Sequence, residues 1–74
     1  MNVAVELFGQ LSPQLPRRQT LDLASQATAG EAAILLGLNL EEIGLIIING
    51  VQSEMEDALS TGCRLCFFPY VSGG

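Results

Sequence analysis

The stretch TAGEAAILLG, residues 28–37, decides how the rest of this 74-residue chain can fold. Thr28 and Glu31 form a capping box, in which each side chain bonds a backbone N–H group at the start of a helix. Gly37 is placed to end that helix in a left-handed conformation. The spacing therefore predicts one short helix, of about ten residues.

The apolar residues of this helix predict which side of it faces the core. Ala29, Ala33 and Leu36 share one face at helical spacing, with Ala32 or Leu35 beside them. Small alanine side chains would let the helix lie close to a sheet. A chain of this length forms one small domain, so one helix is available to cover one sheet face.

Two stretches before the helix alternate as strands do. In residues 2–8 one face is apolar and the other mixed: Val3, Val5 and Leu7 against Ala4, Glu6 and Phe8. Residues 9–16 contain Gly, Ser and two Pro, which predicts a loop. Residues 17–23 alternate more weakly, with Leu21 and Leu23 inward, and are expected to pair with the first strand as a hairpin.

Strands are also predicted after the helix. Residues 44–49 are rich in isoleucine and apolar on both faces, so both faces should be at least partly covered, and Ile46 and Ile48 fit either one. A turn at Asn49-Gly50 leads to a short return strand, residues 51–53. The last strand spans residues 63–68, and Pro69 is expected to end its ladder because it has no N–H.

The order β-β-α-β-(β)-β predicts an α+β fold of the β-grasp, or ubiquitin-like, type. The last strand is expected beside the first, in parallel, in the middle of a mixed sheet of four to five strands. We expect a single domain over residues 1–74 with a flexible Gly-Gly tail from about residue 70. No apolar run is long enough for a membrane span and no signal peptide is evident, which favours a cytoplasmic protein.

Composition narrows the function. The net charge is −5, and the only basic residues are Arg17, Arg18 and Arg64. This balance argues against nucleic-acid binding and favours a basic partner surface. The chain has no His, which removes the commonest general base and metal ligand, and no Lys to accept an isopeptide bond. We therefore expect neither a self-contained enzyme nor a metal site.

The two cysteines, Cys63 and Cys66, form a Cys-x-x-Cys pair. One such pair without a second pair or a His is a poor zinc site. On a strand, residues three apart point to opposite faces with Cα atoms about 10 Å apart, beyond disulfide reach. We interpret both as packing residues rather than as a site of thiol chemistry.

The chain closes with LCFFPYVSGG, residues 65–74. Gly73 and Gly74 have no side chains, so they can enter a channel too narrow for other residues and carry the terminal carboxylate with them. The alternative is a frayed end. Leu65 and Phe67 are assigned to the core and Phe68 to a docking face, although both aromatics could belong to the core. Arg64 is interpreted as a solvated strand residue.

Residues 67–74, FFPYVSGG, resemble the Phe-Phe-Pro-Pro-Val-x-Gly-Gly ending of MoaD proteins, the small subunits of molybdopterin synthase. With the element order, Phe8-Gly9, Asn49-Gly50 and the Gly62 turn, the whole chain resembles the ThiS/MoaD sulfur-carrier family. Two departures bear on the pathway. The family's Asp-Gly-Asp turn is Thr61-Gly62-Cys63 here, and Tyr70 replaces its second Pro.

The resemblance implies a two-step activation. An E1-like enzyme of the MoeB or ThiF type would adenylate the Gly74 carboxylate with ATP and Mg²⁺, and a sulfur donor, often a persulfide, would displace AMP to leave a thiocarboxylate. The carrier, which binds no cofactor itself, would pass this sulfur to an enzyme such as the large subunit of molybdopterin synthase. Gly73 and Gly74 would be the reacting residues. The partner-binding residues would be Phe68, Pro69, Tyr70, Val71 and Ser72.

The leading functional prediction is thus a sulfur carrier in molybdopterin biosynthesis, for the molybdenum or tungsten cofactor. A ThiS-type carrier for thiamine thiazole synthesis, or for another thiolation, is the nearest alternative. A ubiquitin-like modifier joined through Gly74 to target lysines is a second. A plain interaction module with a disordered tail is a third.

Overall fold

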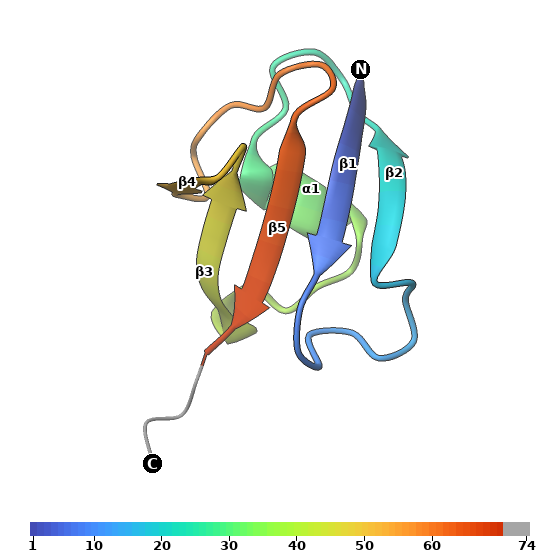
Figure 1. Ribbon diagram of the computed structural model, residues 1–74, viewed down its shortest axis with the longest axis vertical. Helices are drawn as coiled ribbons and strands as arrows, with labels where there is room; N and C mark the ends of the chain where they lie inside the picture. The colour runs from blue at the N-terminus through green and yellow to red at the C-terminus, as the bar shows by residue number, and fades with distance from the viewer. Residues whose placement is uncertain (71–74) are drawn as a thin grey trace.

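The computed structural model describes residues 1–70, and a five-stranded mixed sheet forms its centre (Figure 1). One helix and one 3-10 turn connect the first two strands to the remaining three. The elements in chain order are β1 (Asn2–Leu7), β2 (Arg18–Asp22), α1 (Ala29–Leu35), η1 (Leu40–Glu42), β3 (Ile43–Ile48), β4 (Val51–Ser53) and β5 (Arg64–Pro69). The predicted α+β class and order of elements are confirmed.

The last strand, β5, lies in the centre of the sheet, whose strand order is β2-β1-β5-β3-β4. It runs parallel to β1 and antiparallel to β3, as the sequence predicts. Because both of its edges are paired and its core side is covered, Leu65 and Phe67 are fully buried. The strand that leads into the C-terminal residues is therefore held by a paired strand on each side.

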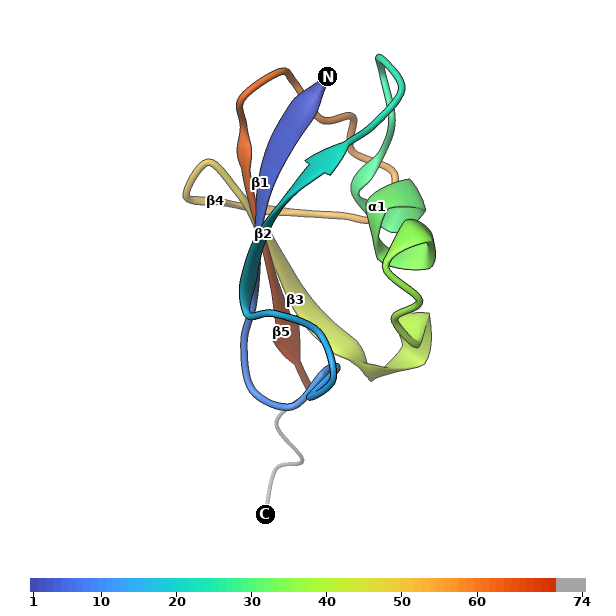
Figure 2. The same cartoon turned by 90° about the vertical axis from the view of Figure 1, so that its right-hand side faces the viewer.

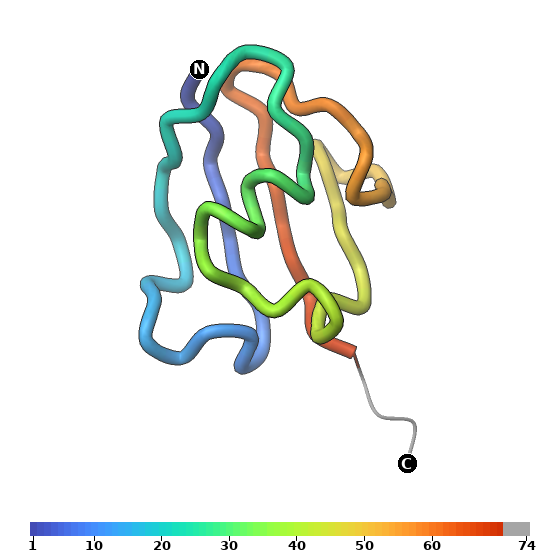
Figure 3. Tube along the Cα trace, turned by 180° about the vertical axis from the view of Figure 1, so that it is seen from behind, coloured from blue at the N-terminus to red at the C-terminus, as the bar shows by residue number. Residues whose placement is uncertain are grey.

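The helix covers one face of the sheet only, and the other face is open (Figure 2). Seen from behind, α1 crosses over the central strands (Figure 3). Its alanines make this close approach possible, since Ala29, Ala32 and Ala33 are all fully buried. The main side chains beneath it are Val3, Val5, Leu7, Ile46, Leu65 and Phe67.

The capping box forms as predicted. The Thr28 hydroxyl accepts from the Glu31 N–H at 3.1 Å, and the Glu31 carboxylate accepts from the Thr28 N–H at 3.1 Å. The helix is shorter than predicted, seven residues instead of about ten, because Leu36 is already the C-cap and Gly37 turns left-handed with φ +75°. Leu35 is 61% exposed, so Ala32 takes the flanking core position.

The strand pairing shows where the last strand ends and which face Ile46 and Ile48 take. Pro69 ends the ladder, as expected, although the strand runs one residue further than predicted: Pro69 forms the last pair, with Ile43, and the next amide, Tyr70 N–H, donates to the Glu42 carbonyl at 3.1 Å. The neighbouring amide thus supplies the donor that proline lacks. Ile46 and Ile48 both face the helix side, where Ile46 is buried and Ile48 packs against the core.

The two cysteines are free thiols. Cys63 is buried in the core just before β5, and Cys66 is half-buried on β5. No helix among residues 1–70 is long and apolar enough to cross a membrane.

Candidate functional site

The face of the sheet opposite α1, called the open face, carries a patch of half-buried apolar side chains. The strand pairing places Leu45 beside Phe68 and Ile47 beside Cys66 on this face. Phe8 completes the patch, because its ring stacks on Phe68 with centroids 4.3 Å apart and planes inclined by 9°. These five residues are the apolar patch, and none of them belongs to the core beneath the helix. Phe68 therefore lies on the open face, as expected.

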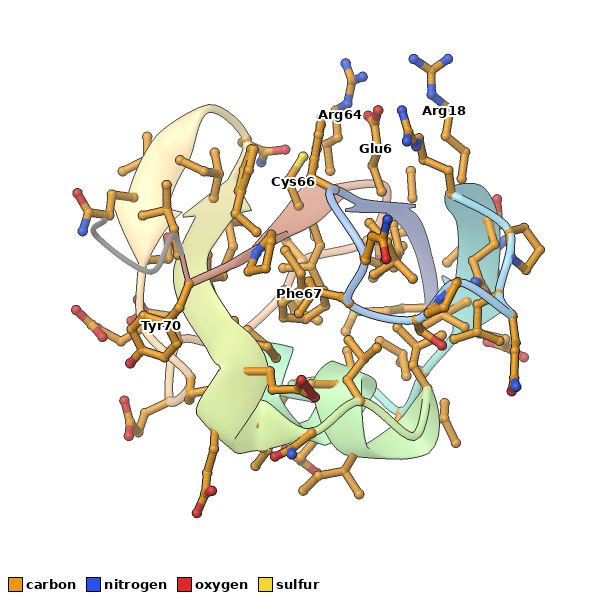
Figure 4. The ribbon with its side chains drawn as sticks, turned by 90° about the horizontal axis from the view of Figure 1, so that it is seen from below. Glu6, Arg18, Arg64, Cys66, Phe67 and Tyr70 are labelled. Atoms are coloured by element: carbon orange, nitrogen blue, oxygen red, sulfur yellow. The ribbon has the colours of Figure 1, made fainter. Side chains whose placement is uncertain are left out.

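An ion-paired cluster lies next to the apolar patch on the same face. Glu6 on β1 accepts from Arg18 Nε at 3.3 Å and from Arg64 Nη2 at 3.2 Å, bridging β2 and β5. Figure 4 shows these three side chains on the side of the sheet away from α1, with Phe67 on the side toward it. The carboxylate is largely covered, whereas both guanidinium groups are mostly exposed. Arg64 is thus solvent-exposed as predicted, but it is also ion-paired.

The two arginines determine the ionisation of Glu6. Burial by itself would raise the pKa of this carboxyl, but the hydrogen bonds from Arg64 and Arg18, with their positive charges, outweigh it and lower the pKa below its ordinary value. Glu6 therefore stays ionised near neutral pH. A shallow hollow of roughly 500 Å³ borders the cluster and is lined by Ala4, Val5, Glu6, Arg18, Gln19, Thr20, Gly62 and Arg64.

Cys66 is the member of the apolar patch nearest the ion-paired cluster, because it pairs with Glu6 across β1 and β5. Burial raises the pKa of its thiol, the Glu6 carboxylate raises it further, and Arg64 offsets part of this. A thiol with a raised pKa is a weaker nucleophile at neutral pH. The environment of Cys66 thus agrees with a packing role. Among residues 1–70, no group of three or more acidic or cysteine side chains is arranged to hold a metal ion.

The chain leaves the sheet at Pro69 and Tyr70, beside the apolar patch. Pro69 is half-buried and Tyr70 is 68% exposed. The other predicted site residues, Val71, Ser72, Gly73 and Gly74, lie outside the described residues, as does most of the expected tail. The structure therefore brings together Phe68, Pro69 and Tyr70 at one end of β5.

Sequence reasoning missed the Glu6–Arg18–Arg64 cluster and the partner of Phe68. The alternation of each strand already placed Glu6 and Arg18 on outward positions. What the sequence lacked was the register, which sets Glu6 opposite Arg18 and sets Arg64 opposite Ala4, two residues before Glu6 on the same face of β1. A search for an outward acid on the first strand and outward arginines on its two neighbours would have found this cluster.

Comparison with known proteins places the chain in a family. The ThiS family model matches residues 5–74, nearly the whole chain. The chain belongs to the ThiS family. No curated protein matches the sequence significantly.

Solved structures agree on the fold. SAMP1 from Haloferax volcanii is 27% identical over all of both chains, with a TM-score of 0.79. A second structure, of H. volcanii small archaeal modifier protein 1, is 24% identical over 95% of this chain and 98% of its own, with a TM-score of 0.77. A chain from the complex of subunits 1 and 2 of the Helicobacter pylori molybdopterin-converting factor is 21% identical over all of both chains, with a TM-score of 0.64.

These findings confirm the β-grasp fold and the ThiS/MoaD family resemblance. The protein thus belongs to a ThiS/MoaD-type family of small ubiquitin-like sulfur carriers and modifiers.

Proposed function

We propose that this protein is a sulfur carrier for molybdopterin biosynthesis, and that the Gly74 carboxylate carries the sulfur as a thiocarboxylate. The observation that carries the proposal is the position of Pro69 and Tyr70. The central strand, β5, ends at these residues, directly beside the apolar patch. A partner that covers this patch would have the C-terminal residues within reach of its own active site.

The chemistry requires no catalytic side chain from the carrier. A Gly74 carboxylate oxygen attacks the α-phosphorus of ATP, and pyrophosphate leaves. A persulfide sulfur then attacks the activated carbonyl, and AMP leaves. A thiol of the donor system cleaves the resulting S–S bond and is oxidised to a disulfide, which frees the thiocarboxylate. A bare carboxylate is a poor electrophile, so the adenylate supplies the leaving group. ATP and Mg²⁺ belong to the activating enzyme, of the MoeB or ThiF type.

The open face suggests the chemistry of that enzyme's docking surface. Apolar side chains would cover the apolar patch, and carboxylates would meet the exposed guanidinium groups of Arg18 and Arg64. Most other acids of the carrier lie away from this cluster, on α1, η1 and the connection after β4: Glu31, Glu41, Glu42, Glu54, Glu56 and Asp57. The basic partner surface that the net charge of −5 predicts would fit this acidic part of the carrier rather than the open face.

Two features support molybdopterin as the pathway. The ending FFPYVSGG follows the MoaD pattern except at Tyr70. A chain of the Helicobacter pylori molybdopterin-converting factor has the same fold over the full length of both chains, and it was solved in a complex of two subunits. The sulfur-accepting partner would then be the large subunit of molybdopterin synthase, with this chain as the small one.

A protein-modifier role is the second candidate, favoured by the match to SAMP1, which is 27% identical over all of both chains. In that role the adenylated Gly74 would be transferred to lysines of other proteins. The chain itself has no Lys to accept such a bond.

Intact-mass spectrometry after incubation with the adenylating enzyme, ATP, Mg²⁺ and a persulfide donor tests the proposal. A carrier gains the mass of one sulfur and loses that of one oxygen, and a variant lacking Gly74 gains nothing. Adding the large subunit and the pterin precursor should then consume the thiocarboxylate. Covalent adducts on other proteins, without a stable thiocarboxylate, would favour the modifier role. Consumption by a thiazole-forming enzyme instead would reassign the pathway.

A further inference from the structure

Two glycines flank the last residues of β5, one on each side of the strand. Gly44 lies in β3, and Gly9 follows β1. β5 runs between β1 and β3 (Figure 1). The two glycines therefore approach Pro69 and Tyr70 from opposite sides. We call the pair, with the two residues they enclose, the tail clamp.

Gly44 has no room for a side chain. A Cβ atom built there would lie 2.8 Å from Tyr70 Cα, 2.9 Å from Tyr70 N and 3.0 Å from Pro69 O. All three are backbone atoms, so no side-chain rotation can relieve the contact. Gly44 is also the extra residue between Ile43 and Leu45 where the pairing with β5 shifts register. Glycine at such a bulge commonly marks the close approach of another backbone.

Gly9 meets the same segment from the other side. A Cβ there would lie 2.6 Å from Pro69 Cγ and 3.1 Å from Cδ, which are atoms of a stiff ring. Its φ of +64° also suits glycine better than any residue with a side chain. On both sides of β5, the residue that lies against the end of the strand is thus a glycine.

Hydrogen bonds secure the enclosed segment. On the β3 side, Tyr70 N–H donates to the Glu42 carbonyl at 3.1 Å. On the β1 side, Phe8 N–H donates to the Phe67 carbonyl at 3.0 Å. The backbone is therefore held as far as Phe67 on the β1 side and as far as Tyr70 on the β3 side, although the Tyr70 side chain is exposed.

We propose that Gly44, with Gly9, is a positioning residue for activation of the C-terminus, because it sets where and in which direction the chain leaves the domain. The inference rests on the proposed function. Gly74 is four residues beyond Tyr70, so its reach from that point is at most about 14 Å. A docked domain with a held Tyr70 limits the volume that the carboxylate must search. In general, a misplacement of about 1 Å at a reacting group can cost about 10²-fold in rate.

Gly44→Ala tests this through the separation of kcat from KM. The new Cβ displaces Tyr70 while leaving the apolar patch and the core intact. We expect kcat for ATP–pyrophosphate exchange by the adenylating enzyme to fall about 10- to 100-fold, with KM for the carrier nearly unchanged. Gly44→Val should lower kcat further. Phe68→Ala should show the opposite pattern, a raised KM, because it alters docking.

Gly50→Ala is the matched control. Gly50 lies in the β3–β4 turn with φ +81°, and a Cβ there would meet nothing within 4 Å. This variant loses stability through backbone strain, but it should keep the wild-type kcat. If Gly50→Ala lowers kcat as much as Gly44→Ala does, general destabilisation explains both and the clamp is overturned.

Hydrogen exchange of the Tyr70 amide provides a readout that needs no partner. It should be protected in the wild type, through its bond to Glu42, and should exchange faster in Gly44→Ala with the core amides unchanged. Wild-type kcat in Gly44→Ala would refute the positioning role. If no adenylating enzyme activates the wild type, the proposed function fails. Hydrogen exchange then tests the clamp by itself: a Tyr70 amide that exchanges at the same rate in Gly44→Ala as in the wild type would overturn it.

Discussion

Phe67 and Phe68 are adjacent on β5, yet they belong to two different surfaces. Phe67 is 0% exposed beneath α1, whereas Phe68 is half-buried on the open face against Phe8. Both rings are apolar and both residues are in the same strand. Only the helix, which covers one face, separates a residue needed for folding from one available for binding (Figures 2 and 4).

The two faces of the sheet also differ in the polar and charged groups that they carry. The helix side is built from Val, Leu, Ile, Phe and small Ala side chains, with the thiol of Cys63 among them. The open face combines the apolar patch with a charged cluster in which one carboxylate bridges two exposed guanidinium groups. Exposed apolar surface beside oriented charges is typical of a surface that binds a partner transiently.

Phe67→Ala should have the largest effect on this comparison. It removes a fully buried aromatic side chain, which costs about 3–5 kcal/mol of stability in cores. In a chain of 74 residues a single core rarely supplies more than about 3–5 kcal/mol in total, so this variant should be largely or partly unfolded. Urea denaturation followed by circular dichroism measures the loss. Phe68→Ala is the control and should cost clearly less. Equal losses would show that both rings are core residues.

A double-mutant cycle on Phe8 and Phe68 should show a smaller effect. The stacked geometry, with centroids 4.3 Å apart, predicts a coupling free energy of about 0.5–1.5 kcal/mol. Urea unfolding of Phe8→Ala, Phe68→Ala and the double variant provides the cycle. Stability losses that simply add would mean that the two rings do not support each other in solution.

The smallest effect is expected for Glu6→Gln and appears as a change in acid sensitivity. The folded-state pKa of Glu6 is lowered, so its stabilising contribution is present above the ordinary carboxyl pKa of 4.5 and is lost as pH falls below it, through the folded value. Glu6→Gln should reduce stability at neutral pH and flatten its decline in acid. Melting temperatures from pH 7 down to pH 2 would test this, with the exposed Glu56→Gln as control. Parallel curves for wild type and Glu6→Gln would contradict the lowered pKa.

Much of the fold follows from local patterns. The Thr28–Glu31 capping box, the alternation in residues 2–8 and the β-branched run before Asn49 each predict their elements, because these signals act over a few residues. The ends of elements were less predictable. The helix ends sooner than expected, and the ladder extends through Pro69, because neighbouring amides and caps determine where a hydrogen-bond series stops.

The sequence by itself determined the class of protein: a β-grasp domain of the ThiS family with no His or Lys and a glycine-rich ending. Only the tertiary structure decided which outward residues meet. Glu6 forms an ion pair with Arg64, 58 positions away, and Phe8 stacks on Phe68. Gly44 lies against the backbone of Tyr70. The physical reason is that strand alternation specifies a face, whereas contact across a sheet depends on register. Register is set when β5 inserts between β1 and β3, by pairings among segments far apart in the chain.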